Sequence, residues 1–395
     1  MDALRGLGAS SVALSHFLIA FVVEPQWHEG KLKMIAYWLG MVFYGGHSAL
    51  PFFFMLSGFV LALPAVNNKP QSYSVFITRR GFRLYVPYVV ALAIAILGNS
   101  RWHGPLYLTS WVNQTWPWPG HVDKHQVLQH LLIFGPVHWA QFNTAFWTLI
   151  VSLRLSVVFP VLCYMVLRTR PLVSTLAVAF TAFVVTWYQL HGVINSYTMT
   201  LHMTGFFIVG ILLARYKDEV FAWASALSER RKTVYLFVAL FVYWYSGMLL
   251  QLFWKHNVSS VNFRLVVFDW AIASGSIMIL ILSIEFKPLS RILMARFPQF
   301  MGRICYSVYL MHGTVLFVLL YTLSHKWPPL AIFLVYVPSV LCASSLFHYT
   351  IEKPSMNFGR SITKSTPQSN ILTTAEAHAS WVMEHDSPGS LRRGV

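Results

Sequence analysis

Apolar runs of about 20 residues recur along the whole sequence, and each is long enough to cross roughly 30 Å of hydrocarbon as a helix. Charged residues make up only 11% of the chain, less than half of their share in an ordinary soluble domain. This composition argues against a soluble globule. Segments of about ten residues with alternating polarity, typical of a membrane β-barrel, are not evident. The sequence therefore predicts an all-α, polytopic membrane protein whose backbone hydrogen bonds form within helices.

The hydrophobic pattern predicts ten membrane-spanning helices, over residues 4–23, 48–66, 84–99, 145–167, 172–188, 198–215, 233–250, 266–285, 305–324 and 328–349. Two other apolar segments, 34–45 and 127–139, are too short to span and are predicted to be re-entrant or interfacial. After residue 360 the hydrophobic periodicity stops, and Ser, Thr, Pro and charged residues take over. We therefore expect a transmembrane domain over residues 1–360 and a disordered cytoplasmic tail over residues 361–395.

The distribution of basic residues predicts the orientation of the chain. With a cytoplasmic N-terminus, 21 of the 29 Lys and Arg residues fall in inner segments, seven fall in outer segments, and Arg154 falls inside a span. This split follows the positive-inside rule and places both termini in the cytoplasm. It also explains the net charge of +16 without nucleic acid as a partner. The first span begins almost at Met1, so no cleavable signal peptide is expected.

Two other features of the composition carry expectations of their own. The three cysteines, Cys163, Cys305 and Cys342, lie in separate apolar runs without a CxxC spacing, so we expect no disulfide and no bound metal. The predicted outer loop, residues 100–144, is rich in Trp and Pro. This favours anchoring of its aromatic side chains at the membrane interface over a lid above a pocket.

Arg5 and His16 are the first charged or titratable positions that need an explanation. They are eleven residues apart, so on a helix they lie within roughly 20° of one face and about 16 Å apart along the axis. In the predicted orientation Arg5 lies at the cytoplasmic rim and His16 near the middle of the membrane, where an ionisable group is costly and by default functional. The alternative is a core histidine bonded to a neighbouring helix.

An arginine at the cytoplasmic rim and a histidine deeper on the same helix face suit a long substrate with an anionic head. Acyl-coenzyme A has that shape. The planar guanidinium of Arg pairs well with phosphate, and the imidazole of His16 suits a general base for an alcohol. A second basic cluster, Arg79, Arg80 and Arg83, precedes the third predicted span, and Arg79 and Arg83 share a helical face. This cluster either anchors the helix by the positive-inside rule or grips the nucleotide phosphates.

Four further residues lie within predicted spans. Ser57 is a weak candidate for a nucleophile because no GxSxG elbow surrounds it, and the Ser57–Gly58 pair permits a close helix approach or a bend. Arg154 requires a carboxylate, a water-filled cavity or a bound anion. Asp269 lies at a similar membrane depth, so a structural Arg154–Asp269 pair and a substrate role both stay open. His312 is a second intramembrane imidazole that either packs or functions.

Taken in order, these stretches resemble the acyltransferase 3 family of integral membrane acyltransferases over residues 1–360. "MDALRGLGASSVALSHF" is similar to the family's opening LDGLRG stretch with its Arg-x10-His pair. The other matching pieces are "FFFMLSGFVLA", "RRGFRLYVP", "FWTL" with a later "FP", "GRICYSVYLMH" and "IEKP". Each match is short, but six occur in the family's order on a ten-helix frame.

The resemblance implies transfer of an acyl group, often acetyl, from acyl-CoA to a hydroxyl on a carbohydrate, a lipid-linked sugar or a small molecule. It also implies a multi-pass protein of the bacterial inner membrane, with Arg5 and His16 as the essential pair and His16 as the base. Arg79, Arg80 and Arg83 inherit a role in donor binding. One position departs from the pattern: many members have W-S-L-x-x-E-x-R in the fourth span, and this chain has Ser152 where the glutamate would fall.

The mechanism we expect is a direct transfer, in which His16 removes the proton of the acceptor hydroxyl as its oxygen attacks the thioester. An acyl-histidine intermediate is the alternative within this chemistry. Three other functions stay open. They are a proton-coupled transporter with a relay of Arg154, Asp269 and His16, a cytochrome with His16 and His312 as haem ligands, and an impaired family member that only binds.

Overall fold

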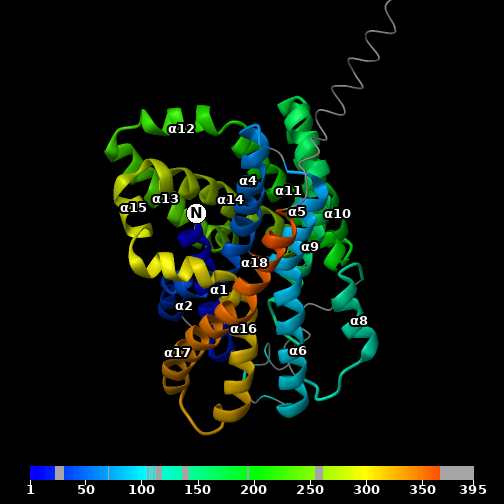
Figure 1. Ribbon diagram of the computed structural model, residues 1–395. Helices are drawn as coiled ribbons and strands as arrows, with labels where there is room; N and C mark the ends of the chain where they lie inside the picture. The colour runs from blue at the N-terminus through cyan, green and yellow to red at the C-terminus, as the bar shows by residue number, and fades with distance from the viewer. Residues whose placement is uncertain are drawn as a thin grey trace, which may run out of the picture.

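The computed structural model describes residues 1–22, 31–69, 71–104, 106, 108–109, 112, 118–135, 142–193, 195–253 and 261–364. Within these ranges every regular element is helical (Figure 1). Nine helical segments in the described part are long and apolar enough to cross a membrane. The predicted fold class, an all-α polytopic membrane protein, is therefore confirmed. The tail beyond residue 364 lies outside the described residues.

The helices at the predicted spans have closely similar bounds. They are α1 (Asp2–Phe21), α4 (Ala49–Val66), α6 (Val86–Arg101), α9 (Phe146–Arg168), α10 (Pro171–Leu190), α11 (Ser196–Arg215), α13 (Glu229–Phe253), α14 (Val261–Glu285), α16 (Arg296–Leu323) and α17 (Pro329–Phe347). All except α13 lie in the nine candidate spans. The predicted span 233–250 is thus helical, but it is not one of the nine.

Shorter helices connect these elements. They are α2 (Lys31–Leu39), α3 (Met41–Tyr44), η2 (Gly45–Ser48), α5 (Tyr73–Arg80), η3 (Gly81–Tyr85), α8 (Lys124–Leu132), α12 (Lys217–Ser225), α15 (Lys287–Leu293), η5 (His348–Glu352) and α18 (Lys353–Ile362). The short apolar segment 34–45 forms parts of α2 and α3. The segment 127–139 begins in α8, and its residues 136–139 lie outside the described part.

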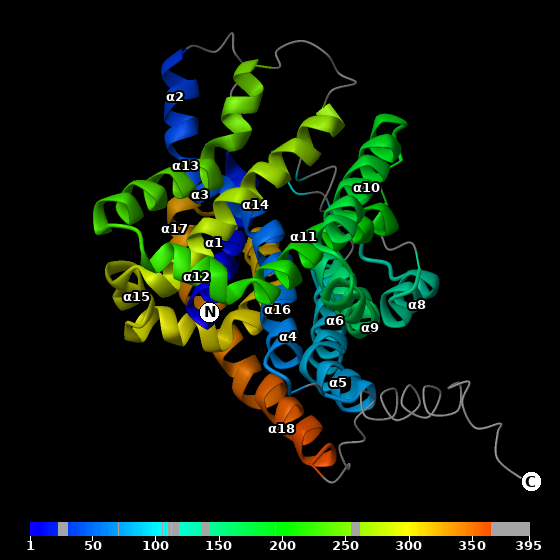
Figure 2. The ribbon, with the colours of Figure 1, turned by 90° about the horizontal axis from the view of Figure 1, so that it is seen from above.

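The centre of the molecule is a close contact between α1 and α16, which run in the same direction (Figures 1 and 2). Gly6 of α1 faces Gly302 of α16, and a Cβ on Gly6 would lie 2.5 Å from the Gly302 backbone nitrogen. Small residues let two membrane helices approach in this way. The contact sets the relative register of the two helices, and ten residues further along each of them lie His16 and His312.

A second close contact joins α4 and α11. A Cβ on Gly58 would overlap the carbonyl of Phe207, and a Cβ on Gly210 would overlap the carbonyl of Met55. The predicted close approach at the Ser57–Gly58 pair is thus confirmed. The two contacts belong to different parts of the apolar core, which consists of one cluster around α1, α6, α16 and α17 and another around α4, α11, α13 and α14. Helix α9 contributes to both clusters.

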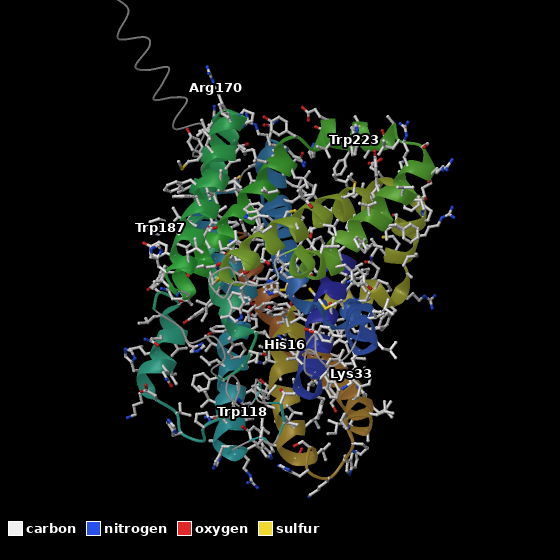
Figure 3. The ribbon with its side chains drawn as sticks, turned by 180° about the vertical axis from the view of Figure 1, so that it is seen from behind. His16, Lys33, Trp118, Arg170, Trp187 and Trp223 are labelled. Atoms are coloured by element: carbon white, nitrogen blue, oxygen red, sulfur yellow. The ribbon has the colours of Figure 1, made fainter. Side chains whose placement is uncertain are left out.

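Trp118 corrects the expectation for the outer loop. Its side chain is buried, stacks on Tyr321 with ring centroids 5.9 Å apart, and donates a hydrogen bond from Nε1 to the Phe142 carbonyl. It therefore packs inside the protein and does not anchor the loop at a membrane interface. Figure 3 shows Trp118 towards one end of the molecule, with His16 in the interior and Arg170 and Trp223 towards the opposite end. This arrangement agrees with the predicted orientation, in which Arg170 and Trp223 are cytoplasmic.

We predict that Gly6→Ala destabilises the protein by about 1–3 kcal/mol, because the added methyl group meets the α16 backbone. Unlike a side chain, the backbone cannot rotate away from the methyl group. The measurement is thermal unfolding of the purified protein in detergent. Gly81→Ala is the matched control, since a Cβ at Gly81 meets nothing within 4 Å. Equal losses of stability in the two variants would contradict the role assigned to the α1–α16 contact.

Candidate functional site

A cavity lies between α1, α4, η3, α9 and α16, where the two apolar clusters meet. The space that it encloses, its open end included, is about 970 Å³. Much of its wall is apolar, with Leu50, Phe53 and Phe54 of α4 and Leu149 of α9 among the lining residues. Such a wall suits the apolar part of an organic ligand.

Three arginines line this cavity: Arg5 of α1, and Arg80 and Arg83 on either side of the α5–η3 junction. Arg5 bonds to Asp2 at 3.2 Å, and Arg80 donates to Ser156 Oγ from Nε at 3.1 Å and from Nη2 at 2.9 Å. No Asp or Glu is among the described residues that line the cavity. Its arginine end therefore carries a positive charge that suits an anionic ligand.

Arg79 does not line the cavity. Its Nε donates to Thr363 Oγ1 at 2.9 Å, beyond the end of α18. The sequence predicts that Arg79 and Arg83 share a face, but Arg80 and Arg83 are the pair that reaches the cavity. Residues at i and i+3 are neighbours on a helix as well as residues at i and i+4, so spacing alone does not decide between the two pairs. The hydrogen bond of Arg79 to Thr363 takes its side chain away from the cavity.

His16, which is half-buried, and His312, which is fully buried, form a pair of imidazoles. His16 Nδ1 lies 3.1 Å from His312 Nε2, and the two rings stack with centroids 5.2 Å apart. His312 Nδ1 lies 2.9 Å from the Val308 carbonyl oxygen, which can only accept, so Nδ1 carries the proton of a neutral His312. His312 Nε2 is then the acceptor and His16 Nδ1 the donor. This tautomer puts the lone pair of His16 on Nε2.

Thr144 also contacts this imidazole pair, since its Oγ1 lies 3.1 Å from His16 Nδ1. One helical turn towards the arginines lies a second pair, in which the Tyr309 hydroxyl is 2.7 Å from Thr148 Oγ1. Tyr309 and Thr148 both line the cavity, whereas His16 is not among its lining residues. Arg5 lines the cavity beside α16 and His16 bonds to His312 of α16, and the Tyr309–Thr148 pair lies between the cavity and the imidazoles.

Two other candidate residues also line the cavity. Ser57 of α4 is one, and Ser152, at the position of the family's glutamate, is the other. The Ser152 carbonyl accepts the hydroxyl proton of Ser156, which itself accepts from Arg80. Position 152 therefore belongs to the arginine end of the cavity.

The predicted Arg154–Asp269 pair is wrong. Arg154 is buried and donates to the carbonyls of Ile133 at 2.6 Å, Gly135 at 2.6 Å and Ser196 at 3.0 Å. Its guanidinium also lies 4.7 Å from the centroid of the Tyr197 ring. Carbonyl dipoles satisfy its donors in place of a carboxylate, so Arg154 joins the segment after α8 to the start of α11.

Asp269 is held by two histidines on other helices. Its Oδ1 lies 2.7 Å from His47 Nε2 and its Oδ2 lies 2.7 Å from His202 Nε2. Arg154, Asp269 and His16 thus belong to three separate hydrogen-bonded groups, and the relay expected of a transporter is not formed among them. The direct hydrogen bond between His16 and His312 also disagrees with a haem between them, because axial ligands lie on opposite sides of the iron.

Sequence reasoning missed several members of the site. Tyr309 stands in the quoted stretch "GRICYSVYLMH", three residues before His312, and this helical spacing on one face is the signal that could have found it. Thr144 and Thr148 carry no comparable signal, because threonine is common near helix starts. His47 and His202 were missed because neither stands near Asp269 in the sequence.

In a comparison with family models, the acyltransferase 3 model, described as an acyltransferase domain, matches residues 1–349 of the 395. Comparisons with curated proteins and with solved structures find no match.

We predict that a double-mutant cycle between Arg154→Met and Asp269→Asn gives a coupling energy near zero, within about 0.5 kcal/mol, because the two side chains share no partner. The measurement is the free energy of unfolding of the four proteins in detergent. A cycle between His202→Gln and Asp269→Asn serves as the positive control, since these residues are in contact at 2.7 Å. A large coupling in the first cycle would restore the Arg154–Asp269 pair.

Proposed function

Since the chain belongs to the acyltransferase 3 family and is an integral multi-pass membrane acyltransferase, we propose that its donor is acyl-CoA, with acetyl as the simplest acyl group. The proposed acceptor is a hydroxyl of a carbohydrate, a lipid-linked sugar or a small molecule. The proposed location is the bacterial inner membrane, with the donor entering from the cytoplasm. This direction follows from the positive-inside distribution of Lys and Arg.

The observation that carries the proposal is that one face of α1 has a basic group at one end and an imidazole at the other. At one end Arg5 joins Arg80 and Arg83 around a cavity with no carboxylate in its described lining. At the other end His16 pairs with His312. The phosphates of coenzyme A suit the first end because a guanidinium binds phosphate through several donors. A neutral imidazole suits proton abstraction at the second.

The dimensions of the site agree with the donor. Arg5 and His16 are eleven residues apart on an uninterrupted helix, or about 16 Å along its axis. An extended pantetheine arm is of the same order of length. In the proposed complex this arm lies along the apolar walls formed by Leu50, Phe53 and Leu149, and the thioester reaches the level of Tyr309.

His16 is the proposed base, acting through Nε2. His312 holds the proton of His16 on Nδ1, so the lone pair on Nε2 can accept the proton of the acceptor hydroxyl. As that proton transfers, the acceptor oxygen forms a bond to the thioester carbonyl carbon. The carbon–sulfur bond then breaks, and the thiolate of coenzyme A takes the proton back from His16. Every bond and proton in the transfer is then accounted for, and no acyl-enzyme forms.

We predict that His16→Ala lowers kcat for transfer from radiolabelled acetyl-CoA by roughly 10²–10⁴-fold, because the base is removed. The measurement is label recovered in candidate acceptors incubated with purified protein. His191→Ala, at the exposed end of α10, is the matched control and is expected to keep full activity. Equal transfer by wild type and His16→Ala would refute the base. Labelled protein formed with donor alone would favour an acyl-histidine instead.

We predict that Arg83→Gln raises KM for acetyl-CoA by about 10–100-fold, since a charge-assisted hydrogen bond contributes about 1.5–3 kcal/mol. KM for S-acetylpantetheine, which lacks the phosphates, should not change. The matched control is Arg79→Gln, because the Arg79 side chain turns to Thr363 outside the cavity. An equal rise in KM for both donors would show that Arg83 does not bind the phosphates.

A further inference from the structure

The imidazole pair leaves one requirement of the proposed reaction unmet. When the acceptor oxygen attacks the thioester, negative charge develops on the carbonyl oxygen, and this charge needs a hydrogen-bond donor. In the assigned tautomers, the N–H of His16 points to His312 and the N–H of His312 points to the Val308 carbonyl. Neither imidazole therefore offers its N–H to that oxygen as the attack begins.

The arginines lie too far away to supply the donor. Arg5 is about 16 Å from His16 along the axis of α1, and Arg80 is bonded to Ser156, about three helical turns from the start of α9, which Thr144 precedes. In the proposed complex these guanidiniums bind the phosphates. A donor for the carbonyl oxygen must instead lie next to the imidazoles and on the wall of the cavity.

Tyr309 satisfies both conditions. It lines the cavity, and its ring packs edge-on against His312 with centroids 5.7 Å apart. Thr148 donates its own hydroxyl proton to the Ala145 carbonyl at 2.8 Å, so in the Tyr309–Thr148 hydrogen bond of 2.7 Å the phenol is the donor. The Tyr309 proton thus points to a neutral hydroxyl, an acceptor that an oxyanion would displace easily.

Neighbouring Tyr306 shows the contrast. It also lines the cavity, but its hydroxyl donates to the Leu84 carbonyl at 2.7 Å. Redirecting that proton would leave a backbone carbonyl with one partner fewer, which is costly in the interior. Tyr309 loses only its bond to Thr148 Oγ1. Phe53 packs edge-on against the Tyr309 ring with centroids 5.9 Å apart, and such apolar surroundings strengthen a donor–oxyanion interaction.

We propose that Tyr309 is a catalytic residue whose hydroxyl donates to the thioester carbonyl oxygen in the transition state. This inference rests on the proposed function. As the acceptor oxygen bonds to the carbonyl carbon and its proton passes to His16, the electron pair of the C=O bond moves to oxygen, and the Tyr309 O–H turns from Thr148 to that oxygen. When the electron pair returns, the carbon–sulfur bond breaks. The phenol keeps its proton throughout.

The test compares Tyr309→Phe with Tyr336→Phe in the full-length protein in detergent. Tyr336 is the matched control, because it is a buried tyrosine whose hydroxyl donates to the Ala13 carbonyl of α1 at 3.0 Å. We expect Tyr309→Phe to lower kcat by about 10²–10³-fold while KM for acetyl-CoA and the affinity for a ketone analogue of acetyl-CoA stay unchanged. Tyr336→Phe should lower kcat by less than about threefold.

Thr148→Val separates catalysis from structure if Tyr309→Phe proves unstable. It removes the partner of the Tyr309 hydroxyl but keeps the phenol proton, so the donor role predicts a clearly smaller loss of kcat than in Tyr309→Phe. A structural role of the Tyr309–Thr148 bond predicts the same loss in both variants, and that result would overturn the proposal. Full activity of Tyr309→Phe would also overturn it while leaving the acyl transfer intact, provided that His16→Ala is inactive. Absence of transfer by the wild type would instead reject the proposed function and, with it, this role.

Discussion

The contact between Gly6 and Gly302 is the constraint on which the rest of the site depends. With no Cβ on either residue, the backbones of α1 and α16 approach to a distance that larger side chains would prevent. From this contact both helices run ten residues in the same direction to His16 and His312. The register set by Gly6 near the start of α1 and Gly302 near the start of α16 therefore decides whether the two imidazoles meet.

Arg154, Asp269 and His16 follow one physical rule, which is that an ionisable group withdrawn from solvent is held by a polar partner. Arg154 has backbone carbonyls, Asp269 has two histidines, and His16 has His312. Partners are needed because a low-dielectric interior penalises an unsatisfied polar group by several kcal/mol. At the cavity Arg5 bonds to Asp2 and Arg80 to Ser156, but no carboxylate is among the described residues of its lining. An anionic ligand would supply the missing counter-charge.

The long apolar runs and the Arg5–His16 spacing made the helices and the shared face of α1 predictable, because both depend only on the regular period of a helix. The partners of Arg154 were not predictable, since they are carbonyls that every residue carries and that residue type does not reveal. The choice of Arg80 over Arg79 was not predictable either, since it depends on the contact of Arg79 with Thr363, which is 284 residues away in the sequence. Tyr309 required knowledge of which hydroxyl lies between the cavity and the imidazoles. Tertiary neighbours, and not local pattern, decide each of these cases.

The position of Ser152 bears on the idea that this chain is an impaired member of its family. Ser152 lies eight residues, about 12 Å along the axis, from Thr144, and its carbonyl belongs to the network around Arg80. A glutamate side chain there would face the guanidiniums and could not orient the imidazole of His16. That task falls to His312, which fixes the tautomer through its bond to the Val308 carbonyl. The substitution therefore changes the charge of the donor end, which becomes more positive, and leaves the imidazole pair and its hydroxyl neighbours complete.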